Sequence, residues 1–62
     1  MQSKKEQFIE ECNEKIIESN DFDPQNIDKI CKQHKFYSDF DIDTIDDCIR
    51  IIEQDVIEIS RN

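Results

Sequence analysis

The chain has 62 residues, with 16 acidic and 8 basic side chains and a formal net charge of −8 at pH 7. A chain of this length buries only about 60% of the surface that its unfolded form exposes, and it leaves little room for a substrate pocket. The acidic excess argues against direct binding to nucleic acid or to anionic membranes, because both depend on Lys and Arg. We therefore expect a small non-enzymatic protein that needs no cofactor.

The cysteine count and the hydropathy pattern indicate a compartment. The sequence has three cysteines, an odd number that does not suggest a disulfide framework. No stretch approaches the roughly 20 apolar residues of a membrane span, and residues 1–11 are too polar for a signal peptide. These features predict a cytoplasmic protein with reduced thiols.

The first predicted element is a helix over residues 4–19. The absence of Gly and the single Pro favour helices over the tight turns of a small β domain. Ser3 and Glu6 have the spacing of a capping box, in which each side chain satisfies a backbone N–H at the helix start. The apolar residues of this segment recur at helical spacing, namely Phe8, Ile9, Cys12, Ile16 and Ile17.

The second predicted helix covers residues 24–35. Asp23 is in the N-cap position and Pro24 in the first helical position, where its missing N–H has no cost. Phe22 can pack against Ile27 as a hydrophobic staple. The residues expected on its apolar face are Ile27, Ile30, Cys31 and His34.

The third predicted helix covers residues 42–60 and repeats the start of the second. An Asp-Phe-Asp triplet occurs at residues 21–23 and again at residues 39–41. In the later copy Asp41 is the expected N-cap, and Phe40 can staple onto Ile45. We interpret the similarity as two uses of one good helix start rather than as an internal repeat.

The C-terminal segment admits two structures. Apolar residues recur every three or four positions and predict one buried stripe, formed by Ile45, Cys48, Ile49, Ile52, Val56 and Ile59. Residues 49–52 and 56–59 are also rich in β-branched side chains, which would suit a β-hairpin, but residues 53–55 lack the usual turn residues. The predicted fold is therefore an all-α, three-helix domain over residues 1–62, with two helices plus a C-terminal hairpin as the alternative.

These helices define an expected core. Its predicted members are Phe8, Cys12, Ile16, Ile27, Ile30, Cys31, Ile45, Ile49, Ile52 and Val56. Three aromatic residues are expected to close its ends, namely Phe22, Phe36 and Phe40.

The cysteines and the one histidine offer two chemical hypotheses. Cys31 and His34 lie one helical turn apart, as a thiolate–imidazole pair would, but no orienting group or oxyanion site accompanies them. Together with Cys12 and Cys48 they form a Cys3His set of the kind that binds structural zinc. Because there is no Cys-x-x-Cys pair and free cysteine is often buried as a small hydrophobe, we favour core packing. We keep a zinc-stabilised module as a weaker hypothesis.

A calcium site was considered for the aspartates before the third helix. Asp39, Asp41 and Asp43 alternate as in the opening of an EF-hand loop. However, Thr44 occupies the position where that loop needs Gly, and Arg50 the position of its bidentate Glu. Capping and a favourable interaction with the helix dipole explain these aspartates better.

Acidic charge is concentrated in the last third of the chain. Residues 39–62 carry eight acidic and two basic side chains, whereas residues 21–38 sum to zero. We interpret this segment as a surface that binds and modulates or inhibits a protein partner with a basic surface, for instance a nucleic-acid-binding protein, by charge mimicry. Small regulators encoded by phages offer an analogy. The candidate contact residues are Asp39, Asp43, Asp46, Asp47, Glu53, Ile51 and Ile57.

A structural role is the alternative. Ile51 and Ile57 lie away from the apolar stripe of the third helix, so pairing of this helix with its own copy would bury them. The protein would then be a homodimer or an assembly subunit, and oligomerisation would compensate for a thin core.

Overall fold

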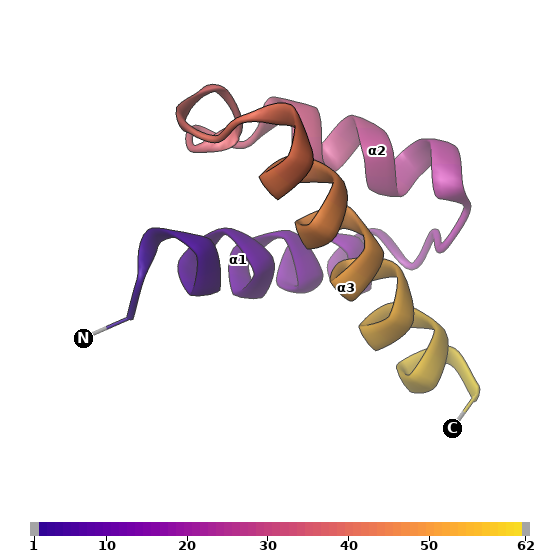
Figure 1. Ribbon diagram of the computed structural model, residues 1–62. Coiled ribbons are helices and arrows are strands. Elements are labelled where there is room, and N and C mark those ends of the chain that lie inside the picture. The colour runs from indigo at the N-terminus through magenta and orange to yellow at the C-terminus, as the bar shows by residue number, and fades with distance from the viewer. Residues whose placement is uncertain (1, 62) are drawn as a thin grey trace.

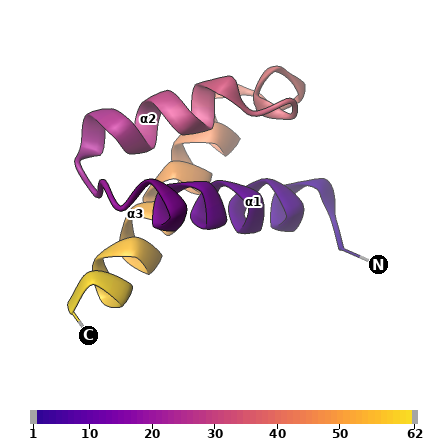
Figure 2. The same cartoon turned by 180° about the vertical axis from the view of Figure 1, so that it is seen from behind.

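The computed structural model describes residues 2–61 and contains three α-helices, α1 (Lys4–Ser19), α2 (Pro24–Gln33) and α3 (Ile42–Arg61). A single 3-10 turn, η1 (Tyr37–Asp39), connects α2 to α3. α1 and α2 run side by side in opposite directions, and α3 crosses both of them (Figures 1 and 2). The all-α prediction is confirmed. No strand occurs among residues 2–61, and the segment proposed for a hairpin is helical throughout.

Each helix begins at the polar side chain that the sequence predicts. Ser3 Oγ accepts a hydrogen bond from the Glu6 N–H at 3.1 Å, and Asp23 Oδ1 accepts one from the Gln25 N–H at 2.9 Å. Asp41 Oδ1 does the same for the N–H of Thr44 at 2.9 Å. These side chains satisfy backbone donors that have no partner within the helix, so the starting points are set locally.

The end of α2 differs from the prediction. The helix stops at Gln33, two residues before the expected end, and His34 is extended with φ −72° and ψ 142°. The His34 ring explains this, because its Nδ1 accepts a hydrogen bond from the Phe36 N–H at 3.0 Å. That bond turns the chain out of the helix and into η1.

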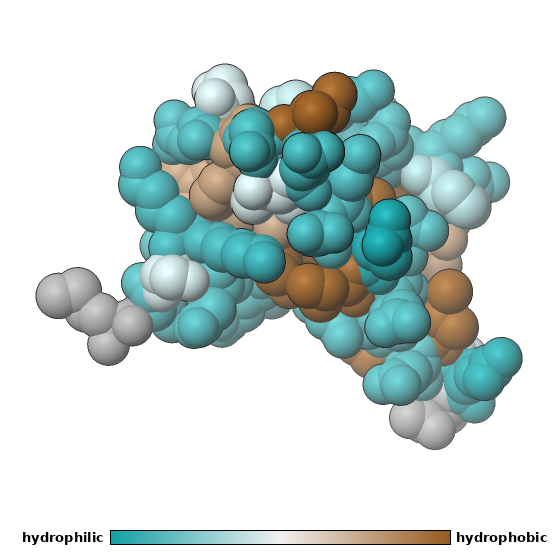
Figure 3. Space-filling view, in the orientation of Figure 1, coloured by the Kyte–Doolittle hydropathy of each residue, from teal (hydrophilic) through white to brown (hydrophobic). Residues whose placement is uncertain are grey.

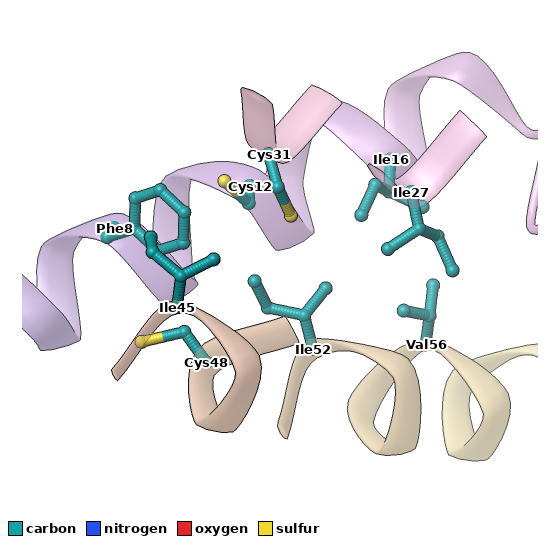
Figure 4. Close-up of a cluster of buried hydrophobic side chains, with 9 residues drawn as sticks. All are labelled: Phe8, Cys12, Ile16, Ile27, Cys31, Ile45, Cys48, Ile52 and Val56. Carbon is teal, nitrogen blue, oxygen red and sulfur yellow. The ribbon is translucent and has the colours of Figure 1, made fainter. Parts of the chain in front are cut away.

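The core lies where the three helices meet (Figure 4). Its nine buried residues are Phe8, Cys12, Ile16, Ile27, Cys31, Ile45, Cys48, Ile52 and Val56. Among the described residues no polar or charged residue belongs to this core, although the side chain of His34, packed edge-on against Phe8, is only 6% exposed. Two predicted core members, Ile30 and Ile49, are only half-buried at its edge, as are the three aromatic residues expected to close its ends.

Two residues of the predicted apolar stripes are exposed, and for Ile59 the reason is the length of α3. α3 has 20 residues and α2 has 10, so the last turns of α3 extend past the other two helices (Figure 1). Ile59 points in the core direction by its spacing but is 45% exposed, since nothing lies opposite it there. Ile17, in the last turn of α1, is 42% exposed. Both belong to the predicted apolar stripes, but neither is a member of the predicted core.

Candidate interaction surface

Three aspartates lie together on the outer side of α3. Asp43, Asp46 and Asp47 are all exposed, whereas Ile45 and Ile52 of the same helix are buried. At about 100° of rotation per residue, the three carboxylates are on the side of the helix opposite Ile52. The buried stripe thus fixes which way they point. We call Asp43, Asp46 and Asp47 the acidic face.

Asp41 is excluded from the acidic face because it caps the helix. Hydrogen bonds from the Thr44 side chain and the Thr44 backbone N–H lower the pKa of the Asp41 carboxyl below its ordinary value. Its charge therefore stabilises the first turn of α3. This agrees with the role that the sequence predicts for Asp41.

Asp39 is exposed but engaged with another helix. It lies in η1, and its Oδ2 is 3.5 Å from Lys4 Nζ of α1. The same ammonium group lies 5.4 Å from the centre of the Phe36 ring. This predicted contact residue therefore belongs to a junction between α1 and η1, and the structure separates it from the acidic face.

One basic side chain lies beside the acidic face. Arg50 is exposed and lies four residues after Asp46 and three after Asp47, a spacing that allows contact on a helix. Even so, among residues 2–61 no ion pair joins Arg50 to either aspartate. The carboxylates of the acidic face are thus open to an external cation.

The other predicted contact residues of α3 lie at different places relative to these aspartates. Ile57 is 50% exposed and follows Asp46 along the outer side of α3 by helical spacing. Ile51 is 40% exposed and lies one turn after Asp47, on the other flank from Ile57, and Glu53 is half-buried. In the space-filling view, apolar surface over α3 is divided into separate areas by hydrophilic side chains (Figure 3). Ile51 therefore borders the acidic face at Asp47, and Ile57 lies on the outer side about three turns further along the helix.

Ile42 is the exposed residue that sequence reasoning missed. It is the first residue of α3, next to Asp43, and is 76% exposed, more than any other large hydrophobic residue of the described chain. The spacing gave no indication of this, because Ile42 lies three residues before Ile45 and continues the stripe. Its exposure shows that nothing covers the stripe at the start of the helix.

The four residues of the zinc hypothesis do not come together. Cys12, Cys31 and Cys48 are buried in the core, but His34 turns away toward α1. Within residues 2–61, no three His, Cys, Asp or Glu side chains are placed to hold a metal ion. Core packing accounts for the thiols.

His34 has a structural environment that the sequence did not reveal. Its side chain is only 6% exposed, and Nε2 lies 2.8 Å from Glu11 Oε1. Since Nδ1 accepts from the Phe36 N–H, Nε2 carries the proton and donates to Glu11. Hydrogen bonds from Gln7 and from His34 lower the pKa of Glu11. Both ring nitrogens are used, so His34 is not available as a base for Cys31.

Comparisons with protein-family models, with curated proteins and with solved structures found no match for this chain. Within the described part of the chain, no helix has the length and apolar character needed to cross a membrane. The same residues enclose no pocket.

Proposed function

We propose that the protein is a small, non-enzymatic interaction protein whose acidic face binds a Lys- and Arg-rich surface on a protein partner and blocks or redirects it. One observation carries the proposal. α2 and α3 start with the same Asp-Phe-Asp triplet, yet α2 has no acidic residue in its first turn. At the positions equivalent to Asp43 and Asp47, α2 has Gln25 and Lys29. A helix start of this kind therefore does not need Asp43 or Asp47.

Stabilisation of α3 does not explain the presence of these three carboxylates either. The helix dipole favours negative charge only within the first turn, which includes Asp43 but not Asp46 or Asp47. Asp43 and Asp47 are four residues apart, and like charges at that spacing destabilise a helix. Three acidic groups on one outward face thus work slightly against the fold and favour a cationic partner.

The charge pattern also supports a class of partner. Carboxylates spaced along a rigid helix resemble a short run of phosphates, so a nucleic-acid-binding protein offers a suitable basic surface. Charge complementarity of this kind acts mainly on the rate of encounter and weakens with salt. Three buried, reduced cysteines suit the cytoplasmic location that we propose.

The test compares two variants with the same net charge. The first is Asp43→Asn/Asp46→Asn/Asp47→Asn. The matched control is Glu10→Gln/Glu14→Gln/Glu18→Gln, which removes three charges from the exposed side of α1. Association with immobilised poly-lysine at low salt, and then with any basic protein captured from the source cells, is measured for both variants and for wild type.

We expect the acidic-face variant to associate about tenfold more slowly than wild type, and the α1 variant to change much less. Equal losses in the two variants would mean that only net charge matters. That result would overturn the proposed role of the acidic face.

A homodimer is the second candidate, and one observation favours it. The last turns of α3 extend beyond the other helices and expose Ile57 and Ile59 by 50% and 45%. A copy of α3 could cover them. Light scattering over a concentration series tests this candidate: a dimer mass that Ile57→Ser reduces to that of a monomer would support it, and a monomer at all concentrations would exclude it.

A further inference from the structure

The imidazole of His34 joins the end of α2 to α1. His34 is the residue directly after α2, and its side chain is only 6% exposed. Its Nε2 lies 2.8 Å from Glu11 Oε1 of α1, and its Nδ1 accepts a hydrogen bond from the Phe36 N–H at 3.0 Å. The ring also packs edge-on against Phe8, with 4.9 Å between the ring centres. A neutral imidazole with its proton on Nε2 satisfies both hydrogen bonds.

Protonation of the ring would affect the two hydrogen bonds in opposite ways. An imidazolium carries a proton on both nitrogens and has no acceptor. The bond from Nε2 to the Glu11 carboxylate would remain and become charge-assisted, which keeps the ring on α1. At Nδ1, however, two N–H groups would face each other, so the Phe36 N–H would lose its acceptor. One proton therefore strengthens one contact of the ring and removes the other.

Among the side chains around the ring, His34 is of the one type that ordinarily changes charge between about pH 5 and 8. Hydrogen bonds from Gln7 and from His34 lower the pKa of Glu11, so this carboxylate is ionised throughout that range. Cysteine, tyrosine and lysine ionise at higher pH, and aspartate at lower pH. The groups of these kinds on the neighbouring segments are Lys4 on α1, Cys31 on α2, Lys35 in the link, and Tyr37 and Asp39 on η1.

We propose that His34 is a pH-sensitive switch: a proton taken up at Nδ1 releases the Phe36 N–H and loosens the link between α2 and α3, while the bond from Nε2 to Glu11 holds the ring on α1. η1 lies in that link and starts after Phe36, whose carbonyl accepts a hydrogen bond from the Asp39 N–H at 3.0 Å. η1 also contacts α1 through the exposed ion pair between Lys4 and Asp39, but such pairs contribute little to stability. Losing the Phe36 bond therefore loosens η1, while the core between the three helices stays closed.

The experiment follows folded wild type by NMR while the pH is lowered from about 8 to about 5. The His34 ring signals report its protonation, and hydrogen exchange at the Phe36 amide reports the hydrogen bond. We expect Phe36 exchange, corrected for the intrinsic effect of pH, to become roughly tenfold faster as His34 takes up its proton, because one hydrogen bond is lost. The internal control is the Gln25 N–H, which donates to Asp23 Oδ1 at 2.9 Å at the start of α2 and should keep its protection.

A matched variant separates the charge of the ring from other effects of pH. His34→Asn offers a neutral acceptor near the position of Nδ1 and takes up no proton. We expect its Phe36 amide to exchange at the same corrected rate across the whole range. An equal acceleration in this variant would show that another group is responsible, and the proposal would be overturned.

Two results in wild type alone would also overturn the proposal. One is a His34 ring that stays neutral until circular dichroism shows that the whole protein has unfolded. The other is a Phe36 amide whose corrected exchange rate does not change while His34 titrates. The test therefore does not depend on the stability of the variant. The acidic face takes no part in these contacts, so the outcome is independent of the proposed function.

Discussion

The starts of α2 and α3 are two versions of one local structure. In each, an Asp-Phe-Asp triplet precedes the helix, and the second aspartate accepts a hydrogen bond from a backbone N–H at 2.9 Å, from Gln25 in α2 and from Thr44 in α3. Phe22 and Phe40 are both half-buried against the core. One short signal therefore starts a helix in two different surroundings.

The two starts differ in the charge that follows them. In α2 the acidic residue after the cap is Asp28, and its Oδ2 lies 3.0 Å from Lys32 Nζ. In α3 the cap is followed by the acidic face, which has no such partner among the described residues. The difference lies in the surface and not in the way the helix begins, and for that reason we assign it to binding.

The largest expected effect tests whether the two starts are equivalent in packing. Ile27 and Ile45 follow their caps at the same distance and are 3% and 4% exposed. We expect Ile27→Ala and Ile45→Ala each to reduce the free energy of unfolding by about 2–5 kcal/mol, because each leaves a cavity in the core. Urea unfolding measures both. If one variant loses less than about 1 kcal/mol, the packing of the two starts is not equivalent.

The second prediction removes the caps. Asp23→Ala and Asp41→Ala each leave a backbone N–H without its side-chain acceptor. We expect Tm to fall by roughly 4–8 °C in both variants, as measured by thermal unfolding. A fall in only one variant would show that tertiary packing, and not the cap, determines the other helix start. Glu14→Ala, which removes an exposed carboxylate of α1 to which no hydrogen bond is found among the described residues, is the control for an effect of charge alone.

The third prediction follows from the lowered pKa of Asp41. Its ordinary value is 3.8, and the hydrogen bonds from Thr44 lower it in the folded state. A group whose pKa is lowered by folding stabilises the protein above its unfolded value, and this contribution disappears as pH falls through the folded value. The difference in Tm between wild type and Asp41→Asn should therefore be constant near neutral pH and shrink below pH 3.8. A difference that does not change with pH would mean that the charge of Asp41 contributes nothing.

Sequence reasoning succeeded wherever the cause was local. The caps at Ser3, Asp23 and Asp41 and the period of the buried stripe identified three helices and most of the core. It failed where two distant segments determine the outcome. Glu11 and His34 are 23 residues apart, and no local pattern indicates their contact or the early end of α2 that accompanies it.

The same distinction between local causes and contacts of distant segments applies to the candidate surface. Helical periodicity alone placed the acidic face opposite the core, because one turn of a helix determines which side each residue occupies. It did not reveal that Lys4 lies against Asp39, since that contact joins α1 to η1. It also gave no measure of how far α3 extends past its neighbours, which is what leaves Ile59 exposed.

The smallest expected effect tests the claim that α3 does not need the charges of the acidic face in order to fold. Replacing Asp43, Asp46 and Asp47 together by Asn removes one favourable interaction with the helix dipole and relieves repulsion between neighbouring carboxylates. These terms oppose each other, so the free energy of unfolding should change by no more than about 0.5 kcal/mol. Added salt should stabilise wild type more than the triple variant, because salt screens a repulsion that only wild type retains. Urea unfolding at low and high salt measures both quantities.

Asp28→Asn is the matched comparison in α2, and it should weaken the fold slightly, because it removes the ion pair with Lys32. If instead the triple variant lost more than about 1 kcal/mol, the acidic face would contribute to stability, and the argument that reserves it for a partner would fail.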